Sequence, residues 1–225
     1  MYIDGEKNEG IFIKRLNRFE ALVRVDNKIE LVHVPNTGRM KELLYEGAKV
    51  ILNKTNNPNR KTKYSLLHIY KNQHLICVNS SLANRVFEEA VLTGEIDWAE
   101  GEIKREVQFF NSRFDFFIKK DEGIFTEVKC ATFEEDGIAK FPDAPTERGK
   151  KHIDELILAN NNYKAAIVII SFMDYVKSFT PNYKIDKEFG EKLIKAFSMG
   201  VIVKAYRCSV SIDEVVLKDE LKIIF

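Results

Sequence analysis

The chain has 225 residues, of which 45% are hydrophobic and 11% aromatic, so it can bury a core in one large domain or two small ones and is not disordered. Its first ten residues are charged and its longest apolar run, 165–173, is too short to cross a bilayer, so we expect a cytoplasmic protein with no secretion signal and no membrane contact. The net charge is +1, but residues 1–80 carry 14 Lys and Arg against 8 Asp and Glu, a balance of +6, whereas residues 81–225 carry 21 against 26, a balance of −5.

Residues 1–80 have the pattern of a small β domain. Short strand-like runs separated by turn residues occupy 18–25, 28–34, 48–54 and 63–70. A short helix is predicted over 38–47, between the second and third runs. About five short strands in roughly 75 residues favour a small closed barrel, of which the OB fold is one kind.

This half also carries the basic residues that we expect to contact phosphate. The segment 53–63 is predicted to be an exposed loop or hairpin tip, with four basic residues and no acidic one. The candidate phosphate contacts are Arg39, Lys54, Arg60, Lys61 and Lys63. Tyr64 and Tyr70 are candidates either for base stacking or for the core. The turn at 36–38 is better explained by ordinary Asn-Thr-Gly turn chemistry than by binding.

The pattern changes near residue 80, and we place a domain boundary at about 78–83, giving domains of 1–80 and 81–225. A helix following the serines at 80–81 is expected to end at Gly94. Strands are then predicted at 103–110, 112–119, 123–130, 163–172 and 201–210, with helices at 147–161 and 186–200. The order α-β-β-β-α-β-α-β predicts a mixed sheet flanked by helices, an α/β (α+β) fold.

A pair of carboxylates is the main chemical signal in the second half. If residues 112–130 fold as a hairpin that is symmetric about Asp121, Asp115 lies opposite Glu127. Directly opposed residues have Cβ atoms about 4.5–5.5 Å apart, and Lys129, two residues beyond Glu127, shares their face. Two carboxylates about 4 Å apart repel by roughly 4 kcal/mol at an effective dielectric of 20, which folding alone would avoid.

A bound divalent cation reverses that repulsion. Carboxylate oxygens suit Mg²⁺, and the metal can generate hydroxide from a bound water and stabilise charge on a phosphate. Lys129 is placed to orient that water or to stabilise the oxyanion. The alternative is a solvated strand face with a weak Glu–Lys pair, and a register slip of one residue would separate the two acids.

The same residues resemble a known group of nucleases. The order of Asp115 and Glu-Val-Lys at 127–129, after a helix, resembles the PD-(D/E)xK nuclease superfamily. Longer stretches resemble the sugar fermentation stimulation protein (SfsA) family: HVPNTGRM (33–40), RKTKYSL (60–66), VNSSLANRVFEEA (78–90), SRFDFF (112–117), EVKCATF (127–133), FPDAPTERGKKHIDEL (141–156) and GVIVKAY (200–206). The resemblance implies an N-terminal OB-like domain, a C-terminal restriction-endonuclease-like domain, DNA binding, and a link to the regulation of sugar utilisation genes.

The resemblance also implies roles for single residues. Asp115 and Glu127 would bind Mg²⁺ or Mn²⁺, and Lys129 would complete the catalytic set. Many superfamily members add an acid from the preceding helix, for which Glu89 is preferred over Glu88. Cys130 stands where the family tends to have a polar residue, but it is expected to point away from Glu127.

The helix predicted over 147–161 carries a polar face. Arg148, Lys151 and His152 are candidates to contact the scissile phosphate, with a solvated face as the alternative reading. Asp143 or Thr146 is expected to cap the helix. Gly149 in the first turn lowers helix propensity, which a close approach of backbone or ligand would explain.

Three functions remain open from the sequence. The first is a Mg²⁺-dependent DNA nuclease, favoured by the complete set of acidic and basic residues. The second is a non-catalytic DNA-binding regulator of sugar-metabolism genes that retains a nuclease fold. The third, a metal-binding scaffold for protein partners, leaves the basic half unexplained. Many nucleases of this kind act as dimers, so a homodimer also remains open.

Overall fold

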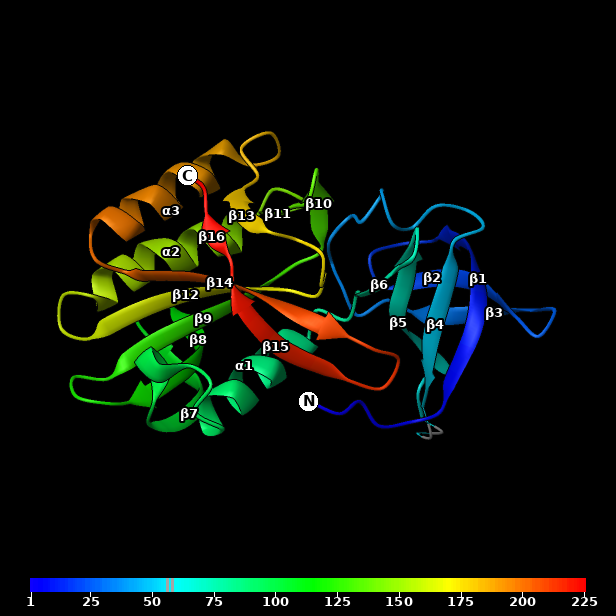
Figure 1. Ribbon diagram of the computed structural model, residues 1–225, viewed down its shortest axis with the longest axis horizontal. Helices are drawn as coiled ribbons and strands as arrows, with labels where there is room; N and C mark the ends of the chain where they lie inside the picture. The colour runs from blue at the N-terminus through cyan, green and yellow to red at the C-terminus, as the bar shows by residue number, and fades with distance from the viewer. Residues whose placement is uncertain (56, 58) are drawn as a thin grey trace.

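The computed structural model describes residues 1–55, 57 and 59–225. Figure 1 shows two parts side by side, a β-barrel built from the first third of the chain and a larger part in which helices cover a sheet. The barrel consists of β1 (Lys7–Arg15), β2 (Glu20–Val25), β3 (Lys28–His33), β4 (Lys49–Lys54) and β5 (Tyr64–Lys71). The strand order is β3-β2-β1-β4-β5, and a parallel pairing of β3 with β5 closes the ring.

Alternating side chains build the interior of the barrel. In β2, Ala21, Val23 and Val25 are buried, whereas Arg24 between them is exposed. A sixth strand, β6 (His74–Cys77), pairs with β5 as a hairpin and leads into the second part. The expected OB-like barrel is therefore present.

The helix predicted over 38–47 is wrong, because these residues form turns. Met40 has a φ of +46°, and its backbone N–H donates to Asp143 Oδ2 at 3.2 Å rather than to a helical carbonyl. Met40 and Leu43 are buried in the main core, which contains residues from both halves of the chain. Long-range packing has therefore overridden a local helix propensity.

The second part is built on a six-stranded mixed sheet of order β15-β14-β12-β9-β8-β7. Its strands are β7 (Glu102–Phe109), β8 (Ser112–Lys119), β9 (Ile124–Ala131), β12 (Lys164–Ser171), β14 (Ile202–Val210) and β15 (Val215–Glu220). β7, β8 and β9 are antiparallel neighbours, β9, β12 and β14 are parallel, and β15 is antiparallel to β14. This confirms the mixed sheet expected from the sequence.

Helices cover both faces of this sheet. α1 (Leu82–Leu92) lies on one face, and α2 (Glu147–Ala159) and α3 (Lys187–Ser198) lie on the other (Figure 1). The central strand β12 is buried along almost its whole length: Ile167 and Ile169 belong to the core with α2 and α3, whereas Val168 and Ile170 belong to the core with α1. Burial on both faces explains why β12 reads as an unbroken apolar run.

Several short elements escaped the sequence analysis. A second sheet of order β10-β11-β13-β16 is formed by β10 (Phe133–Glu135), β11 (Ile138–Phe141), β13 (Ser178–Pro181) and β16 (Lys222–Ile223), and a 3₁₀ turn, η1, spans Asp97–Ala99. Strands of two to four residues show no usable periodicity. β1, β6 and β15 were missed as well, and the charges and glycine in β1 hide its alternation.

Three cysteines that are distant in the sequence share one core. Cys77 of β6 and Cys208 of β14 are buried in the core that contains α1, and Cys130 of β9 packs against it. Burial raises the pKa of all three thiols, to about 12 for Cys77. All three are free cysteines with little thiolate at neutral pH.

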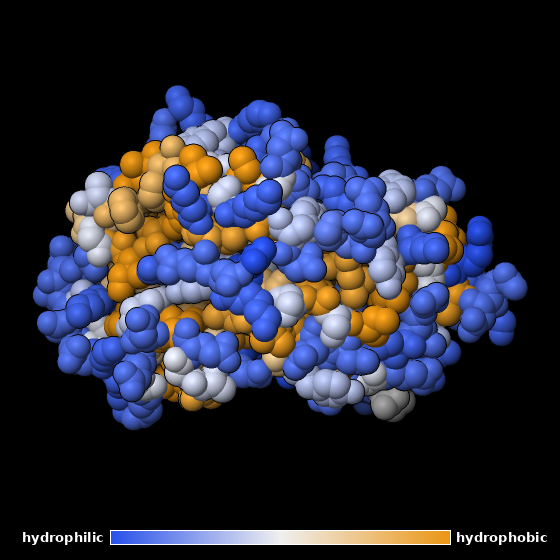
Figure 2. Space-filling view, viewed as in Figure 1, coloured by the Kyte–Doolittle hydropathy of each residue, from blue (hydrophilic) through white to orange (hydrophobic). Residues whose placement is uncertain are grey.

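Hydrophilic side chains cover most of the face shown in Figure 2, and hydrophobic side chains are visible near α3, between α3 and the sheet, and over the barrel. Ile194 and Phe197 of α3 and the terminal Phe225 are among the exposed apolar residues. No helix in the described part of the chain combines the length and apolarity needed to cross a membrane.

Candidate functional site

The β8–β9 hairpin brings Asp115 and Glu127 together. Its pairs are Phe116 with Thr126, Phe117 with Phe125 and Ile118 with Ile124, which is the register symmetric about residue 121. Asp115 and Glu127 lie next to the Phe116–Thr126 pair, where this ladder ends, and both residues line the same cleft. They are also close enough for the Glu127 carboxylate to act on the pKa of Asp115. The assumed register is therefore present up to the Phe116–Thr126 pair. Beyond that pair the two acids line one cleft, with Asp115 bonded to Asn84 of α1 and Glu127 beside His152 of α2, the helices that cover opposite faces of the sheet.

Asp115 is held by two hydrogen bonds and remains poorly solvated. Asn84 Nδ2 of α1 donates to Oδ1 at 2.8 Å, and the backbone N–H of Val128 donates to Oδ2 at 2.8 Å. Burial, and next the negative charge of Glu127, raise the pKa of Asp115 to about 6. The two donors do not fully offset the cost of holding a second buried carboxylate here.

Glu127 is buried, with only 2% of its surface exposed. Lys129 Nζ donates to its Oε1 at 2.5 Å, and His152 Nδ1 of α2 lies 2.6 Å from the same oxygen. Burial acts to raise the pKa of Glu127, but the ammonium of Lys129 and the contact with His152 outweigh it, so the pKa lies below its ordinary value. Glu127 Oε2 is buried and has no hydrogen-bond partner within residues 1–55, 57 and 59–225.

The contacts of His152 define its tautomer. Arg148 Nε donates to His152 Nε2 at 3.3 Å, and a guanidinium cannot accept a hydrogen bond. Nε2 is therefore the accepting nitrogen, which places the ring proton on Nδ1. Nδ1 lies 2.6 Å from Glu127 Oε1, although this contact does not have hydrogen-bond geometry. His152 is 3% exposed, so the polar face predicted for this helix is not a solvated one at this position.

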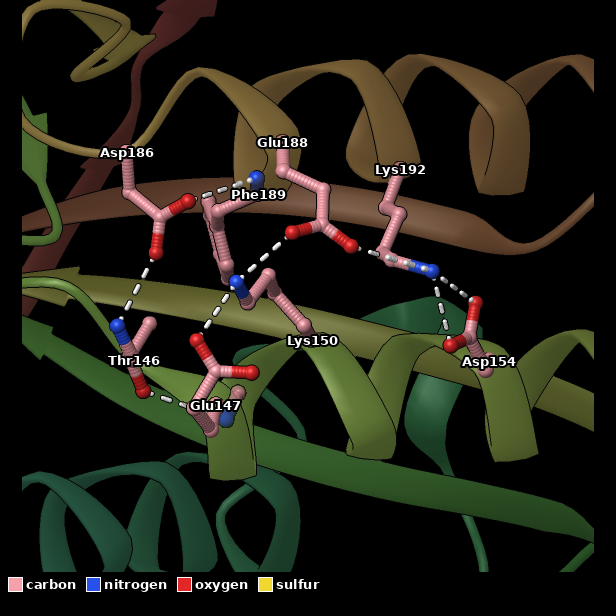
Figure 3. Close-up of polar contacts among 9 residues, drawn as sticks. Thr146, Glu147, Lys150, Asp154, Asp186, Glu188, Phe189 and Lys192 are labelled. Carbon is pink, nitrogen blue, oxygen red and sulfur yellow. Dashed lines mark hydrogen bonds and ion pairs between the residues drawn. The ribbon is translucent and has the colours of Figure 1, made fainter.

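The first turn of α2, which carries Arg148, is fixed by a carboxylate from α3. Asp186 Oδ1 accepts from the backbone N–H of Phe189 at 3.1 Å, and Oδ2 accepts from the backbone N–H of Thr146 at 2.9 Å (Figure 3). Thr146 Oγ1 in turn caps α2 by accepting from the N–H of Gly149 at 3.1 Å. Thr146, rather than Asp143, is the capping residue.

Gly149 is explained by this cap. A Cβ at this position would lie 2.9 Å from both Oγ1 and Cγ2 of Thr146. The close approach expected from the sequence is thus made by the capping side chain. The next residue, Lys150, lies 2.7 Å from both Glu147 and Glu188, which joins α2 to α3 (Figure 3).

The acid expected from α1 does not line the cleft. Glu89 Oε1 lies 2.7 Å from the N-terminal amine of Met1, and Glu88 forms an ion pair with Arg105. The residue of α1 that does reach Asp115 is Asn84, one turn before Glu88. No group of three His, Cys, Asp or Glu side chains in the described part of the chain has metal-binding geometry. The cleft therefore offers two carboxylates rather than three.

Both halves of the chain form the walls of this cleft, which has a volume of about 580 Å³. The barrel contributes Arg18 and the turn 36–38, and the second half contributes the loop 141–148. Asp143 of that loop approaches Gly38 so closely that a Cβ there would lie 2.3 Å from its Oδ2. The glycine of the turn is therefore required for contact between the two halves.

The side chain of Asn36 holds the turn 36–38 in place. Its Oδ1 accepts from the N–H of Gly38 at 2.8 Å, and its Nδ2 donates to the carbonyl of Val78. This is the turn chemistry favoured from the sequence. Arg18 had no signal in the sequence, because only the fold brings the β1–β2 turn to the cleft.

The other basic candidates are spread over different places. Arg148 lines the cleft, whereas Lys151 Nζ donates to the carbonyl of Asn111. Arg60 and Lys61 line a hollow on the barrel together with Arg18, and Arg39 lines a neighbouring one.

Lys54 and Lys63 line neither hollow. Lys54 pairs with Glu6 at 2.6 Å, and Lys63 lies over the ring of Tyr64 at 5.0 Å. Tyr64 is buried in the barrel core and Tyr70 faces another hollow of the barrel, near β1 and β4. Cys130 packs on the α1 side of the sheet, opposite to the side on which Glu127 meets α2.

Comparisons with known proteins agree along the whole chain. Residues 13–78 match the "SfsA N-terminal OB domain" and residues 81–214 the "Sugar fermentation stimulation protein RE domain". Sugar fermentation stimulation protein homologs of Clostridium tetani and of Clostridium botulinum (strain Loch Maree) are 49% and 48% identical over 218 and 217 residues, or 95% and 94% of both chains. A solved structure of Pyrococcus furiosus SfsA in complex with Ca²⁺ has a TM-score of 0.91 and 31% identity and covers 100% of both chains.

Proposed function

The chain belongs to the sugar fermentation stimulation protein (SfsA) family, and from that premise we propose that it is a metal-dependent nuclease that hydrolyses phosphodiester bonds of DNA. One observation carries the proposal. Asp115 and the buried Glu127 share a cleft in which Glu127 Oε2 has no partner among the described residues, next to the ammonium of Lys129. A buried carboxylate oxygen without a partner is costly unless a ligand completes it.

Asp115 and Glu127 are the residues that would hold the cation. Mg²⁺ is commonly bound by one or two carboxylates, with water and substrate phosphate completing its shell, so two acids are sufficient. Its chemistry here would be to activate water and stabilise charge on the phosphate. The related Pyrococcus furiosus protein is described as a complex with Ca²⁺, another cation that prefers oxygen ligands, which adds support.

The chain's own residues would orient the reaction. Asn84 and the N–H of Val128 hold the Asp115 carboxylate, and His152 holds Glu127. Lys129 would stabilise the oxyanion of the phosphate or orient the attacking water. Arg148, at the mouth of the cleft, would bind a neighbouring phosphate as a fixed cation.

A non-catalytic DNA-binding regulator is the second candidate, and the family's name supports it. In that case the cleft would bind DNA through Arg18 and Arg148 without cutting it. The two candidates differ in whether the protein cleaves DNA, because only the nuclease needs both carboxylates intact.

The test uses plasmid and linear DNA with Mg²⁺ or Mn²⁺, and compares wild type with Asp115→Asn, Glu127→Gln and Lys129→Ala. Glu122→Gln is the control, because Glu122 is an exposed acid on the same hairpin that pairs only loosely with Lys164, at 3.7 Å. We expect metal-dependent cleavage that is reduced by at least about 100-fold in the three site variants and unchanged in the control. DNA binding without cleavage by folded wild-type protein would instead establish the regulator.

A further inference from the structure

We propose that the barrel binds an unpaired nucleic-acid strand and leads it into the cleft. The binding surface, called here the Arg18–Phe19 surface, consists of Arg18, Phe19, Arg39, Lys41, Arg60 and Lys61. This inference rests on the proposed nuclease function and narrows its substrate to a single strand, or to a single-stranded segment of a duplex. Four features of the barrel support it: continuity with the cleft, exposed and mostly unpaired positive charge, an exposed ring, and a fixed backbone.

Continuity comes from Arg18, which lines three adjoining hollows. The first is the cleft that contains Asp115 and Glu127. The second, of about 660 Å³, contains Phe19, Arg60 and Lys61, and the third, of about 640 Å³, contains Arg39 and Lys41. A chain of phosphates lying on either outer hollow would therefore pass Arg18 before it reached the two carboxylates.

Most of the positive charges on this surface are not paired with an acid among the described residues. Within the described residues, the side chains of Arg18, Arg39 and Lys41 form no ion pair, and all three are exposed. Lys61 pairs with Glu20 at 2.7 Å, with the Lys61 side chain largely exposed. Among the residues that the structure describes, the Arg60 guanidinium contacts His33 Nδ1, at 3.2 Å, and no carboxylate. Positive charge of this density attracts a phosphate backbone.

The exposed ring distinguishes a single strand from a duplex. Phe19 is 53% exposed at the turn between β1 and β2, and Leu16 beside it is 47% exposed. An OB barrel commonly binds nucleic acid through this turn. The faces of bases are covered in a duplex but accessible in a single strand, where they stack on aromatic side chains. Phe19 beside Arg18 therefore fits an unpaired strand and adds nothing to the binding of a duplex backbone.

The backbone of this surface is fixed before any ligand binds. The Arg15 guanidinium donates to the carbonyls of Arg18 at 2.7 Å, Asn36 at 2.6 Å and Arg39 at 3.0 Å, and also to that of Gly38. A single side chain thus ties the turn that bears Phe19 to the turn that bears Arg39. Such preorganisation lowers the entropic cost of binding.

The test measures the binding of a fluorescently labelled oligonucleotide of about 20 nucleotides, single-stranded or annealed to its complement, by anisotropy in EDTA. We expect the single strand to bind more tightly than the duplex. Phe19→Ala should weaken single-strand binding about tenfold and change duplex binding by less than about twofold. Phe19→Trp should restore the single-strand affinity. Tyr2→Ala is the matched control, because Tyr2 is an exposed ring that lines none of the three hollows.

Duplex binding as tight as single-strand binding, or equal affinities of Phe19→Ala and Tyr2→Ala for the single strand, would overturn the inference. Because EDTA prevents metal-dependent cleavage, this result does not depend on the nuclease function. A parallel cleavage assay with Mn²⁺ separates the two proposals. If duplex DNA is cleaved and Phe19→Ala does not change the rate, only the single-strand inference is overturned. If the single strand binds in a Phe19-dependent way but no DNA is cleaved, only the nuclease proposal is overturned.

Discussion

At the scale of single residues, the two oxygens of the Glu127 carboxylate have different surroundings. Oε1 accepts a hydrogen bond from Lys129 and lies 2.6 Å from His152 Nδ1, whereas Oε2 is buried without a partner in the described part of the chain. The proton on His152 Nδ1 is fixed by Arg148 on the opposite nitrogen, so the imidazole orients Glu127 rather than acting as a base toward it. We therefore regard His152 as a positioning residue. The sequence suggested a different role, a phosphate contact.

His152→Leu is expected to reduce metal-dependent DNA cleavage by about 10–100-fold, because residues that orient metal ligands have effects of this size. His152→Asn should retain most activity, since its amide nitrogen can replace Nδ1 as the donor to Glu127. When the cleavage rate is measured against Mn²⁺ concentration, the Leu variant alone should need a higher Mn²⁺ concentration to reach half of its maximal rate. Equal losses in both variants would indicate a role in packing only.

Asp115 should make stability depend on pH. Its pKa in the folded protein is about 6, against an ordinary value of 3.8, so ionised Asp115 destabilises the fold above pH 6 and the effect disappears below about pH 4. We expect Asp115→Asn to raise the free energy of unfolding by about 1–3 kcal/mol at pH 8 in EDTA and to leave it unchanged at pH 4. Urea unfolding at both pH values measures this difference. A variant less stable than wild type at pH 8 would contradict it.

At the scale of elements, the sequence predicted the β8–β9 hairpin well and the segment 38–47 badly. The hairpin is a local structure with its turn midway between the two strands, so its register could be counted directly. The form of 38–47 depends on Asp143, more than 100 residues later, which no local pattern contains. The same limit hid Asn84: a helical pattern places it on α1, but only the packing of α1 on β8 brings it to Asp115.

The joint between α2 and α3 depends on Asp186, which accepts one backbone N–H from each side (Figure 3). We expect Asp186→Ala to lower the free energy of unfolding by about 2–4 kcal/mol, because two N–H groups lose their acceptor. Thr146→Ala, which removes only the cap of α2, should cost about 1 kcal/mol. Glu191→Ala is the control, since its exposed pair with Lys187 contributes little. Urea unfolding of the three variants measures these losses in the free energy of unfolding. Equal losses for Asp186→Ala and Thr146→Ala would contradict the expectation.

At the scale of the whole molecule, the cleft exists only where the two parts of the chain meet. Its walls come from the barrel turn 36–38 and from the loop 141–148, and one core contains residues of both parts. The sequence predicted two parts and the two acids, but no pattern in either part shows where it contacts the other. That is why Arg18, and the contact of Asp143 with the barrel, were found only in the structure.

Asp143 is the contact that can be tested. Asp143→Ala removes the acceptor of the Met40 N–H and the carboxylate packed on Gly38. We expect faster hydrogen exchange in a peptide covering 36–47 and unchanged exchange in α3, together with a loss of about 1–3 kcal/mol in stability. Glu46→Ala, an exposed acid in the same segment, is the control. Unaltered exchange at 36–47 would show that the two parts hold together without this contact.

The reactivity of the cysteines near this junction can be used to measure how often the two parts separate. Cys77 comes from the barrel side and Cys208 from the sheet, and both are buried, whereas Cys130 is only half-buried and lines the cleft. A thiol reagent can therefore modify Cys77 and Cys208 quickly only when the protein opens locally, and the rate of the slow part of its reaction would report how often the native molecule opens. Wild-type protein already contains the reporter, without any label having to be introduced.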